Sequence, residues 1–210
     1  RQARYRYAGA DAADSFEVGP IDCDFSPGEV VFIVGENGGG KSTFAKLLAG
    51  LYFPDSGEIR MDGQPLRPDG AQAYREHFSV VFTDSFVFEQ LPVTVGTGQG
   101  ERIAHLLRRL ELDQKVSVDE NALSTTRLSH GQRKRLALLH AILEDRPVMI
   151  FDEWAATQDP RFKQFFYLEL LPELKAQGKL VVAITHDIEF AGGADRVLEM
   201  EYGRLSVVRG

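Results

Sequence analysis

Four short apolar runs recur along the chain, separated by helical or polar segments. Runs of this length without polar alternation are typical of strands buried on both faces of a sheet. Because helical segments alternate with them, the pattern predicts an α/β fold built on a parallel sheet. The runs comprise residues 30–34, 78–82, 148–151 and 180–184.

Helices are predicted where apolar residues recur at helical spacing next to suitable end signals. Gly50 follows an apolar segment and commonly ends a helix. Ser129 is a suitable N-cap, and Asp159 followed by Pro160 is a typical helix start. The predicted helices cover residues 44–49, a segment from about residue 100 with Ile103, Leu106, Leu107 and Leu110 on one face, residues 129–143, and residues 160–178.

Shorter alternations of polar and apolar residues predict further strands that are only partly buried. Asp62 and Gly63 form a pair typical of hairpin turns. Small residues at 8–14 predict a loop. The additional strands cover residues 4–7, 15–25, 58–61, 196–200 and 205–208.

A glycine-rich loop lies between the strand at 30–34 and the helix at 44–49, in the pattern G-x-x-x-x-G-K-[ST]. A strand before it and a helix after it favour a P-loop over a plain glycine-rich turn. Glycines let backbone N–H groups converge on phosphate oxygens, and the helix N-terminus attracts negative charge. We expect Lys41 to reach the β- and γ-phosphates and Ser42 to bind Mg²⁺. The residues expected at the nucleotide are Gly35, Asn37, Gly38, Gly39, Gly40, Lys41, Ser42 and Thr43.

Polar residues follow the two later buried strands. Asp152 and Glu153 come after the strand at 148–151, and His186 follows the strand at 180–184. An Asp in this position beside a P-loop is typical of a Mg²⁺ ligand, and the next carboxylate can orient or deprotonate water. The alternative is a solvated strand end. Because ligands of parallel sheets lie at the carboxyl ends of strands, we expect these groups to gather near the P-loop.

Composition narrows the classes of partner and compartment. The formal net charge of −7 argues against a nucleic-acid partner, because phosphate binding needs a basic face. The single cysteine, Cys23, cannot form an internal disulfide, which fits a reducing cytosol. No apolar run approaches the length of a membrane span, and we recognise no signal-peptide pattern in these residues. The start at Arg1 rather than Met indicates a domain taken from a longer chain.

The order of these motifs resembles an ABC transporter ATPase. Between the P-loop and Asp152 lies Leu-Ser-His-Gly-Gln at residues 128–132, directly before a basic helix. Leu-Ser-x-Gly-Gln is the signature of that family, and the resemblance runs from about Tyr5 to the C-terminus. It implies a P-loop NTPase (RecA-like) core with a parallel sheet, formed by residues 1–82 and 147–210. It also implies an antiparallel β edge subdomain and an inserted helical subdomain at 83–146.

The resemblance implies roles for individual residues. Ser129, Gly131 and Gln132 are expected to meet the γ-phosphate held by an opposite subunit. Tyr7 is expected to stack on adenine, with Tyr5 as the competing candidate and an ordinary strand aromatic as the alternative. The expected catalytic residues are Lys41, Glu153 and His186, the expected metal residues are Ser42, Asp152 and Thr83, and residues 156–159 form the expected D-loop at the dimer interface.

Three features depart from the usual family pattern. Thr83, followed by Asp84, stands where the family has a glutamine beside Mg²⁺. In an extended strand these two side chains would point to opposite faces, so we do not expect them to share the role. Asp84 is the stronger magnesium ligand, but we favour Thr83 because it holds the aligned position; the alternative is that neither contacts the metal. His130 replaces a signature glycine, and the segment 83–128 is short. Residues 82–86, 151–160 and 170–172 resemble the cyclic-peptide exporter branch, which serves microcin, lipopeptide and peptide-siderophore efflux.

The resemblance also implies partners and location. We expect ATP and Mg²⁺ as cofactors, a head-to-tail homodimer with ATP between the chains, and a membrane domain fused upstream of Arg1. The chain itself is expected to be soluble, at the cytoplasmic face of a bacterial inner membrane. Two alternatives remain: a soluble ABC-type ATPase not coupled to transport, and a nucleotide-gated scaffold without turnover. The second would lack a base or a switch residue, whereas Glu153 and His186 are present.

Overall fold

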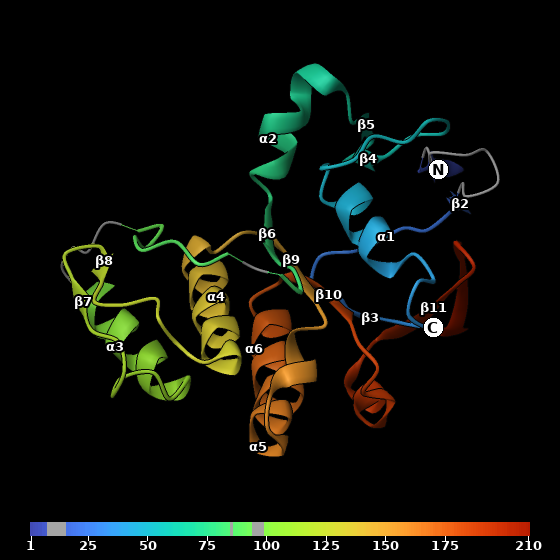
Figure 1. Ribbon diagram of the computed structural model, residues 1–210. Coiled ribbons are helices and arrows are strands. Elements are labelled where there is room, and N and C mark those ends of the chain that lie inside the picture. Colours follow the sequence, from blue (N-terminus) through green and yellow to red (C-terminus); the bar gives the residue numbers. More distant parts are fainter. Residues whose placement is uncertain (8–15, 85, 94–98) are drawn as a thin grey trace.

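A six-stranded sheet forms the centre of the computed structural model, which describes residues 1–7, 16–84, 86–93 and 99–210 (Figure 1). The strand order is β12-β11-β3-β10-β9-β6, and every neighbouring pair is parallel except β11 and β12. The parallel α/β sheet predicted from the apolar runs is therefore confirmed. The strands are β3 (Val30–Val34), β6 (Phe78–Val81), β9 (Val148–Asp152), β10 (Leu180–Ile184), β11 (Arg196–Glu201) and β12 (Arg204–Arg209).

Both faces of this sheet are covered, which explains why its strands lack polar alternation. Along β3, Phe32 belongs to one apolar cluster and Ile33 to the other. The first cluster includes residues of α4 (His130–Glu144) and of the helix that begins at Pro160; the second includes residues of α1 (Lys41–Leu48). Figure 1 shows these helices above and below the strands.

The long helix predicted at 160–178 is present but not uniform. It consists of α5 (Pro160–Gln164), a π-helical segment at Phe165–Leu170 and α6 (Leu171–Ala176). Pro172 has no N–H to donate to the preceding turn, and wider hydrogen-bonded turns are one way in which a helix accommodates such a gap. Phe166, in the π-helical segment, stacks on Trp154 with ring centroids 4.6 Å apart. The irregular segment thus packs against the turn that follows β9.

Small antiparallel sheets flank the central one, as the edge alternations predict. β1 (Ala3–Arg6) pairs with β2 (Glu17–Ile21), which is shorter than the predicted strand at 15–25. β4 (Arg60–Met61) pairs with β5 (Gln64–Pro65) through the predicted hairpin at Asp62. The predicted loop at 8–14 lies outside the described residues. The hairpin of β7 (Val118–Asp119) and β8 (Ala122–Leu123) was not predicted, because two-residue strands carry no periodicity.

The helical segment is built on α3 (Gln99–Arg109), whose predicted apolar face is buried at Ile103, Leu106 and Leu107. These residues share one continuous apolar cluster with α4 and the sheet. The division into a core and a helical subdomain at 83–146 remains a prediction. Among the described residues, no helix is both long and apolar enough to cross a membrane. The remaining helices are α2 (Ala71–Arg75) and the 3₁₀ segments Pro68–Gly70, Trp154–Thr157 and Ile188–Gly193.

Candidate nucleotide and catalytic site

The register of three neighbouring strands brings the predicted site residues to one edge of the sheet. Ile184 of β10 lies opposite Ile33 of β3 on one side and Asp152 of β9 on the other. The segments that continue from these positions carry the P-loop, Glu153 and His186. The expected gathering at the carboxyl ends of the strands is therefore present.

The P-loop is closely packed and rich in left-handed backbone. Gly35 has φ 134°, and a Cβ atom there would lie 2.2 Å from the Met200 carbonyl oxygen. Gly40 begins α1 with φ 105°. Gly38, by contrast, has open space beside it, on a loop whose backbone is suited to hold phosphate. Side chains are thus excluded on one side of the loop while the other side remains accessible.

The Lys41 side chain is buried and folds back over its own loop. Its Nζ donates hydrogen bonds to the carbonyl oxygens of Gly35, at 2.8 Å, and Glu36, at 2.9 Å. Burial lowers the pKa of the ammonium, and the negative charges of Glu153 and Asp152 oppose that shift. The lysine therefore lies across its own loop, with its ammonium held by two main-chain carbonyl oxygens.

Asp152 is the last residue of β9 and is 2% exposed. Within the described part of the chain, its Oδ1 is buried and has no hydrogen-bond partner. Burial raises the pKa of the carboxyl, while a hydrogen bond from Ser42 and the charges of Lys41 and Lys134 lower it. A buried carboxylate oxygen with unused acceptor capacity, beside a hydroxyl, fits the oxygen ligands that Mg²⁺ prefers. Ser42 and Asp152 are therefore suited to hold that ion.

Glu153 and His186 contact each other directly, which the separate motifs did not predict. His186 Nε2 lies 3.2 Å from Glu153 Oε1. Glu153 adopts a left-handed backbone conformation, with φ 52° and ψ 35°, and its N–H donates to the Ile184 carbonyl oxygen at 3.0 Å. Both side chains are partly exposed. The carboxylate is thus oriented by the main chain and by His186 while remaining accessible to water.

The geometric argument that separated Thr83 from Asp84 was wrong. β6 ends at Val81, and both residues lie in a turn rather than in an extended strand. Thr83 Oγ1 donates a hydrogen bond to the Asp152 carbonyl oxygen at 3.2 Å, whereas Asp84 is exposed. Thr83 therefore lies beside the expected metal residue, and its contact with Mg²⁺ remains a prediction.

Three tyrosines gather beside α1 (Tyr5, Tyr7 and Tyr52). The Tyr7 hydroxyl accepts a hydrogen bond from Thr43 Oγ1 at 3.3 Å and lies 3.4 Å from the Tyr52 hydroxyl. Tyr5 stacks on Tyr52, with ring centroids 4.8 Å apart. Tyr52 was missed in the sequence because it comes beside Tyr5 and Tyr7 only when β1 pairs with the segment that follows α1. The contact with Thr43 supports Tyr7 as the residue nearer to the nucleotide.

Tyr7→Ala is expected to weaken ATP binding at least several-fold, because stacking of a base on an aromatic ring contributes about 1 to 3 kcal/mol. Tyr5→Ala serves as the matched control and should have little effect, since the Tyr5 ring is already stacked on Tyr52. Titration of each variant with a fluorescent ATP analogue measures the difference. The reverse ranking would assign the adenine contact to Tyr5.

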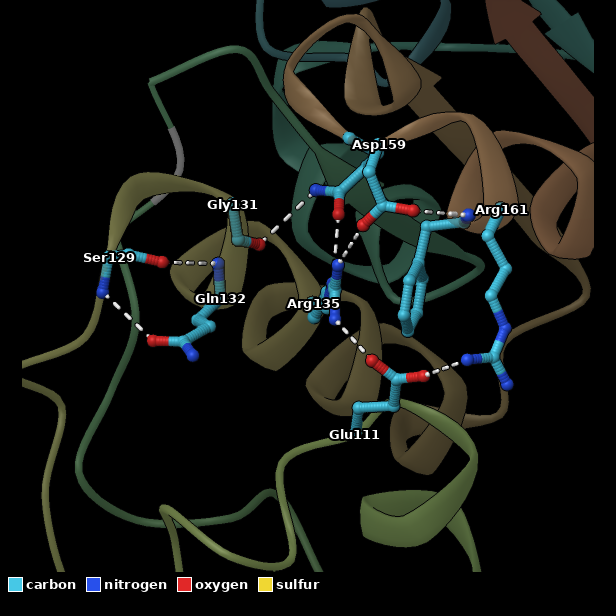
Figure 2. A network of polar contacts seen from close by, with 9 residues as sticks. Glu111, Ser129, Gly131, Gln132, Arg135, Asp159 and Arg161 are labelled. Carbon is cyan, nitrogen blue, oxygen red and sulfur yellow. Dashed lines mark hydrogen bonds and ion pairs between the residues drawn. The ribbon is translucent and has the colours of Figure 1, made fainter.

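The signature segment begins α4 and forms its own cap (Figure 2). The Ser129 side chain accepts a hydrogen bond from the Gln132 N–H, and the Gln132 side chain accepts one from the Ser129 N–H at 3.1 Å. Ser129 and His130 are exposed. Figure 1 shows α4 well separated from α1, so this chain does not bring its own signature and P-loop together.

Arg135 ties the signature helix to the expected D-loop, as Figure 2 shows. It donates to Gln158 Oε1 at 2.9 Å and to Asp159 Oδ2 at 2.8 Å, and Gln158 Nε2 donates to the Gly131 carbonyl oxygen at 3.2 Å. The guanidinium carbon lies 3.2 Å from the centre of the Phe162 ring. Sequence reasoning missed this network, because only folding places α4 beside the start of α5. The signature and the D-loop are thus held together within one chain.

Sequence comparisons place the chain among known proteins. The ABC transporter family profile matches residues 18–156. ATP-binding protein SyrD of Pseudomonas syringae pv. syringae is 44% identical over 97% of this chain and 36% of its own length. The energy-coupling factor transporter ATP-binding protein EcfA1 of Lactiplantibacillus plantarum is 36% identical over 96% of this chain and 74% of its own length. The chain therefore spans about a third of SyrD but most of EcfA1.

The fold is also similar to solved structures. A dimeric ATP-binding cassette in a post-hydrolysis state, bound to ADP and Pi, matches with a TM-score of 0.81 and 22% identity. The match covers 100% of this chain and 98% of that one. At this identity the likeness concerns the fold, which is the P-loop NTPase architecture with its mixed sheet and small antiparallel sheets.

Proposed function

Because the chain belongs to the ABC transporter family, as an ATP-binding domain that hydrolyses ATP, we propose that it powers export of a peptide or peptide-siderophore cargo. The observation that carries this cargo class is the sequence at 82–86 and 151–160, which resembles the cyclic-peptide exporter branch. The chain is more similar to SyrD, at 44% identity, than to EcfA1, at 36% identity. This difference supports a role other than that of an energy-coupling factor protein. An ABC-type ATPase not coupled to transport is the second candidate.

The residues at the strand ends have complementary roles in the proposed reaction. Lys41 would exchange its two carbonyl contacts for phosphate oxygens and stabilise their negative charge. Glu153 would orient and deprotonate the attacking water, and His186 would hold the γ-phosphate and the Glu153 carboxylate in register. Ser42 and Asp152, with Thr83 beside them, would hold Mg²⁺, which when bound neutralises charge on the phosphates.

We propose that a complete site needs two chains arranged head to tail. Ser129, Gly131 and Gln132 lie apart from the P-loop of their own chain, on a helix N-terminus suited to an anion. A second copy would supply the P-loop and its nucleotide.

We further propose a membrane domain upstream of Arg1, with the ATP-binding domain at the cytoplasmic face of a bacterial inner membrane. The exposed and mutually packed rings of Phe86 and Phe88 provide an apolar surface for contact with that domain.

Phosphate release by the full-length protein in liposomes tests the cargo class. With Mg²⁺-ATP we expect basal turnover, and cyclic peptides or peptide siderophores should stimulate it because cargo binding favours the closed dimer. Linear peptides of the same composition serve as the matched control. Basal turnover without stimulation by any peptide would contradict peptide export. Binding of ATP without phosphate release would instead favour a nucleotide-gated scaffold.

A further inference from the structure

Lys134 is a buried lysine in the first turns of the signature helix, and it has no role in the reaction described above. Its side chain is only 3% exposed. Lysines are rarely buried unless their charge is compensated. The Nζ atom donates a hydrogen bond to the main-chain carbonyl oxygen of Glu153 at 2.8 Å. The contact therefore joins α4 to the residue that carries the expected general base.

The contact between α4 and the Glu153 turn is reciprocal. Trp154, the next residue, donates from Nε1 to the Lys134 carbonyl oxygen at 2.7 Å and is itself 1% exposed. Two hydrogen bonds of opposite direction thus join the same two segments. A purely apolar contact would allow the turn to slide, whereas this pair fixes its position along α4.

The main chain of Glu153 is held on both sides. Its N–H donates to the Ile184 carbonyl oxygen at 3.0 Å, and its carbonyl oxygen accepts from Lys134 at 2.8 Å and from the Ala156 N–H at 3.3 Å. Between these contacts the residue has φ 52°, a conformation that L-amino acids with a side chain rarely adopt. Backbone strain of this kind persists only where the surroundings over-determine it. Of these three hydrogen bonds, the one from Lys134 is the shortest and the only one that comes from a side chain.

Acidic residues surround Lys134 and favour its charged form. Burial lowers the pKa of its ammonium, and the carboxylates of Glu153, Asp152 and Asp84 raise it. The Lys134 ammonium thus offsets part of the negative charge of these carboxylates from α4. Lys41 does the same for Glu153 and Asp152 from the P-loop. This places Asp84, which the metal assignment left unused, in the same electrostatic cluster.

We propose that Lys134 is a positioning residue for the general base: it holds the Glu153 main chain in the left-handed conformation that orients the carboxylate. The role rests on the proposed ATPase mechanism. Lys134 lies two positions after Gln132 on the same helix, so the orientation of the base in one site depends on the helix whose start serves the other site. Movement of α4 on engagement of the partner's nucleotide would therefore reach Glu153 through Lys134.

Lys134→Met removes the ammonium but keeps an unbranched apolar side chain, and it is expected to lower kcat about 100-fold, the cost of a small misplacement of a catalytic group. The KM for ATP should remain unchanged, because Lys134 does not contact the P-loop. Lys134→Arg, which keeps charge and donors, should restore part of the rate. The matched control is Lys179→Met, which removes another buried lysine whose Nζ donates to a carbonyl oxygen, that of Arg146 at 2.8 Å.

A double-mutant cycle separates positioning from general destabilisation. In a Glu153→Gln background, Lys134→Met should cause no further loss of turnover, because its effect acts through the missing base. Thermal unfolding of both methionine variants measures their stability, and Lys134→Gln provides a folded variant without charge if Lys134→Met unfolds. The inference is overturned if Lys134→Met has the same kcat as Lys179→Met, or if Lys134→Met lowers turnover as much in the Glu153→Gln background as in the wild type. The proposed function stands in either case as long as the wild type turns over ATP. Absence of wild-type turnover overturns both.

Discussion

Replacing Glu153 with glutamine is expected to reduce ATP turnover about 10²- to 10⁴-fold while ATP binding is retained, since this is the usual contribution of a general base. Glutamine has nearly the same shape, so the main-chain contacts from Ile184 and Lys134 should survive. The amide cannot accept a proton from water at neutral pH. The variant should therefore accumulate as a nucleotide-bound dimer, detected by size-exclusion chromatography with Mg²⁺-ATP.

Single-turnover phosphate release measures the chemical step itself. Glu173→Gln is a suitable control, because Glu173 is a distant carboxylate of α6 paired with Arg109. It should turn over ATP at the wild-type rate. Turnover of Glu153→Gln at that same rate would remove Glu153 from the role of base and leave His186 as the next candidate.

Two inactive variants of this chain are expected to restore activity when mixed. Lys41→Met removes the phosphate-binding charge, and Gly131→Asp places a carboxylate where the signature is expected to meet the γ-phosphate. A Cβ atom at Gly131 would have its nearest neighbour, the Thr157 carbonyl oxygen, at 3.4 Å, so the substitution causes limited strain. Each variant alone should be nearly inactive. An equal mixture should regain about a quarter of the wild-type sites, because half of the dimers would be mixed and each would have one intact site.

The design has an internal control. Mixing Lys41→Met with the double variant Lys41→Met, Gly131→Asp leaves no intact P-loop and should restore nothing. Phosphate release by the first mixture at several total concentrations gives the fraction of mixed dimers. If the first mixture remains as inactive as the control, each chain must complete its own site, and the head-to-tail arrangement is wrong.

The sequence predicted the parts of the molecule that depend on short segments. The doubly buried strands were recognisable because neither face is polar, and the P-loop was recognisable because phosphate binding needs glycine at fixed spacing. Asp152 and Glu153 lie at the end of β9, where the apolar run before them indicated, with Asp152 as the last residue of the strand. In each case one continuous stretch contains both the structural signal and the chemical one.

The contacts between segments could not be predicted in this way. The end of β6 was predicted to within one residue, but the backbone at Thr83 and Asp84 was assumed to be extended, because nothing in the local pattern marks the turn there. Tyr52 and Arg135 acquire their neighbours only through packing, across 45 residues in the case of Tyr52 and Tyr7. In the sequence, Lys134 is one of several basic residues of a helix and has no visible partner. Only the fold buries it against the Glu153 carbonyl oxygen.

The cap formed by Ser129 and Gln132 has a consequence for the thermodynamics of assembly. In the single chain these two groups satisfy each other, so an unassembled domain leaves neither of them unpaired. Engagement of a partner's nucleotide would replace a neutral hydrogen bond with one to a charged phosphate, and only the difference between the two favours association. Loss of the γ-phosphate would cancel that difference and return the loop to its internal cap. In the proposed dimer, the same few atoms would thus favour closure before hydrolysis and separation after it.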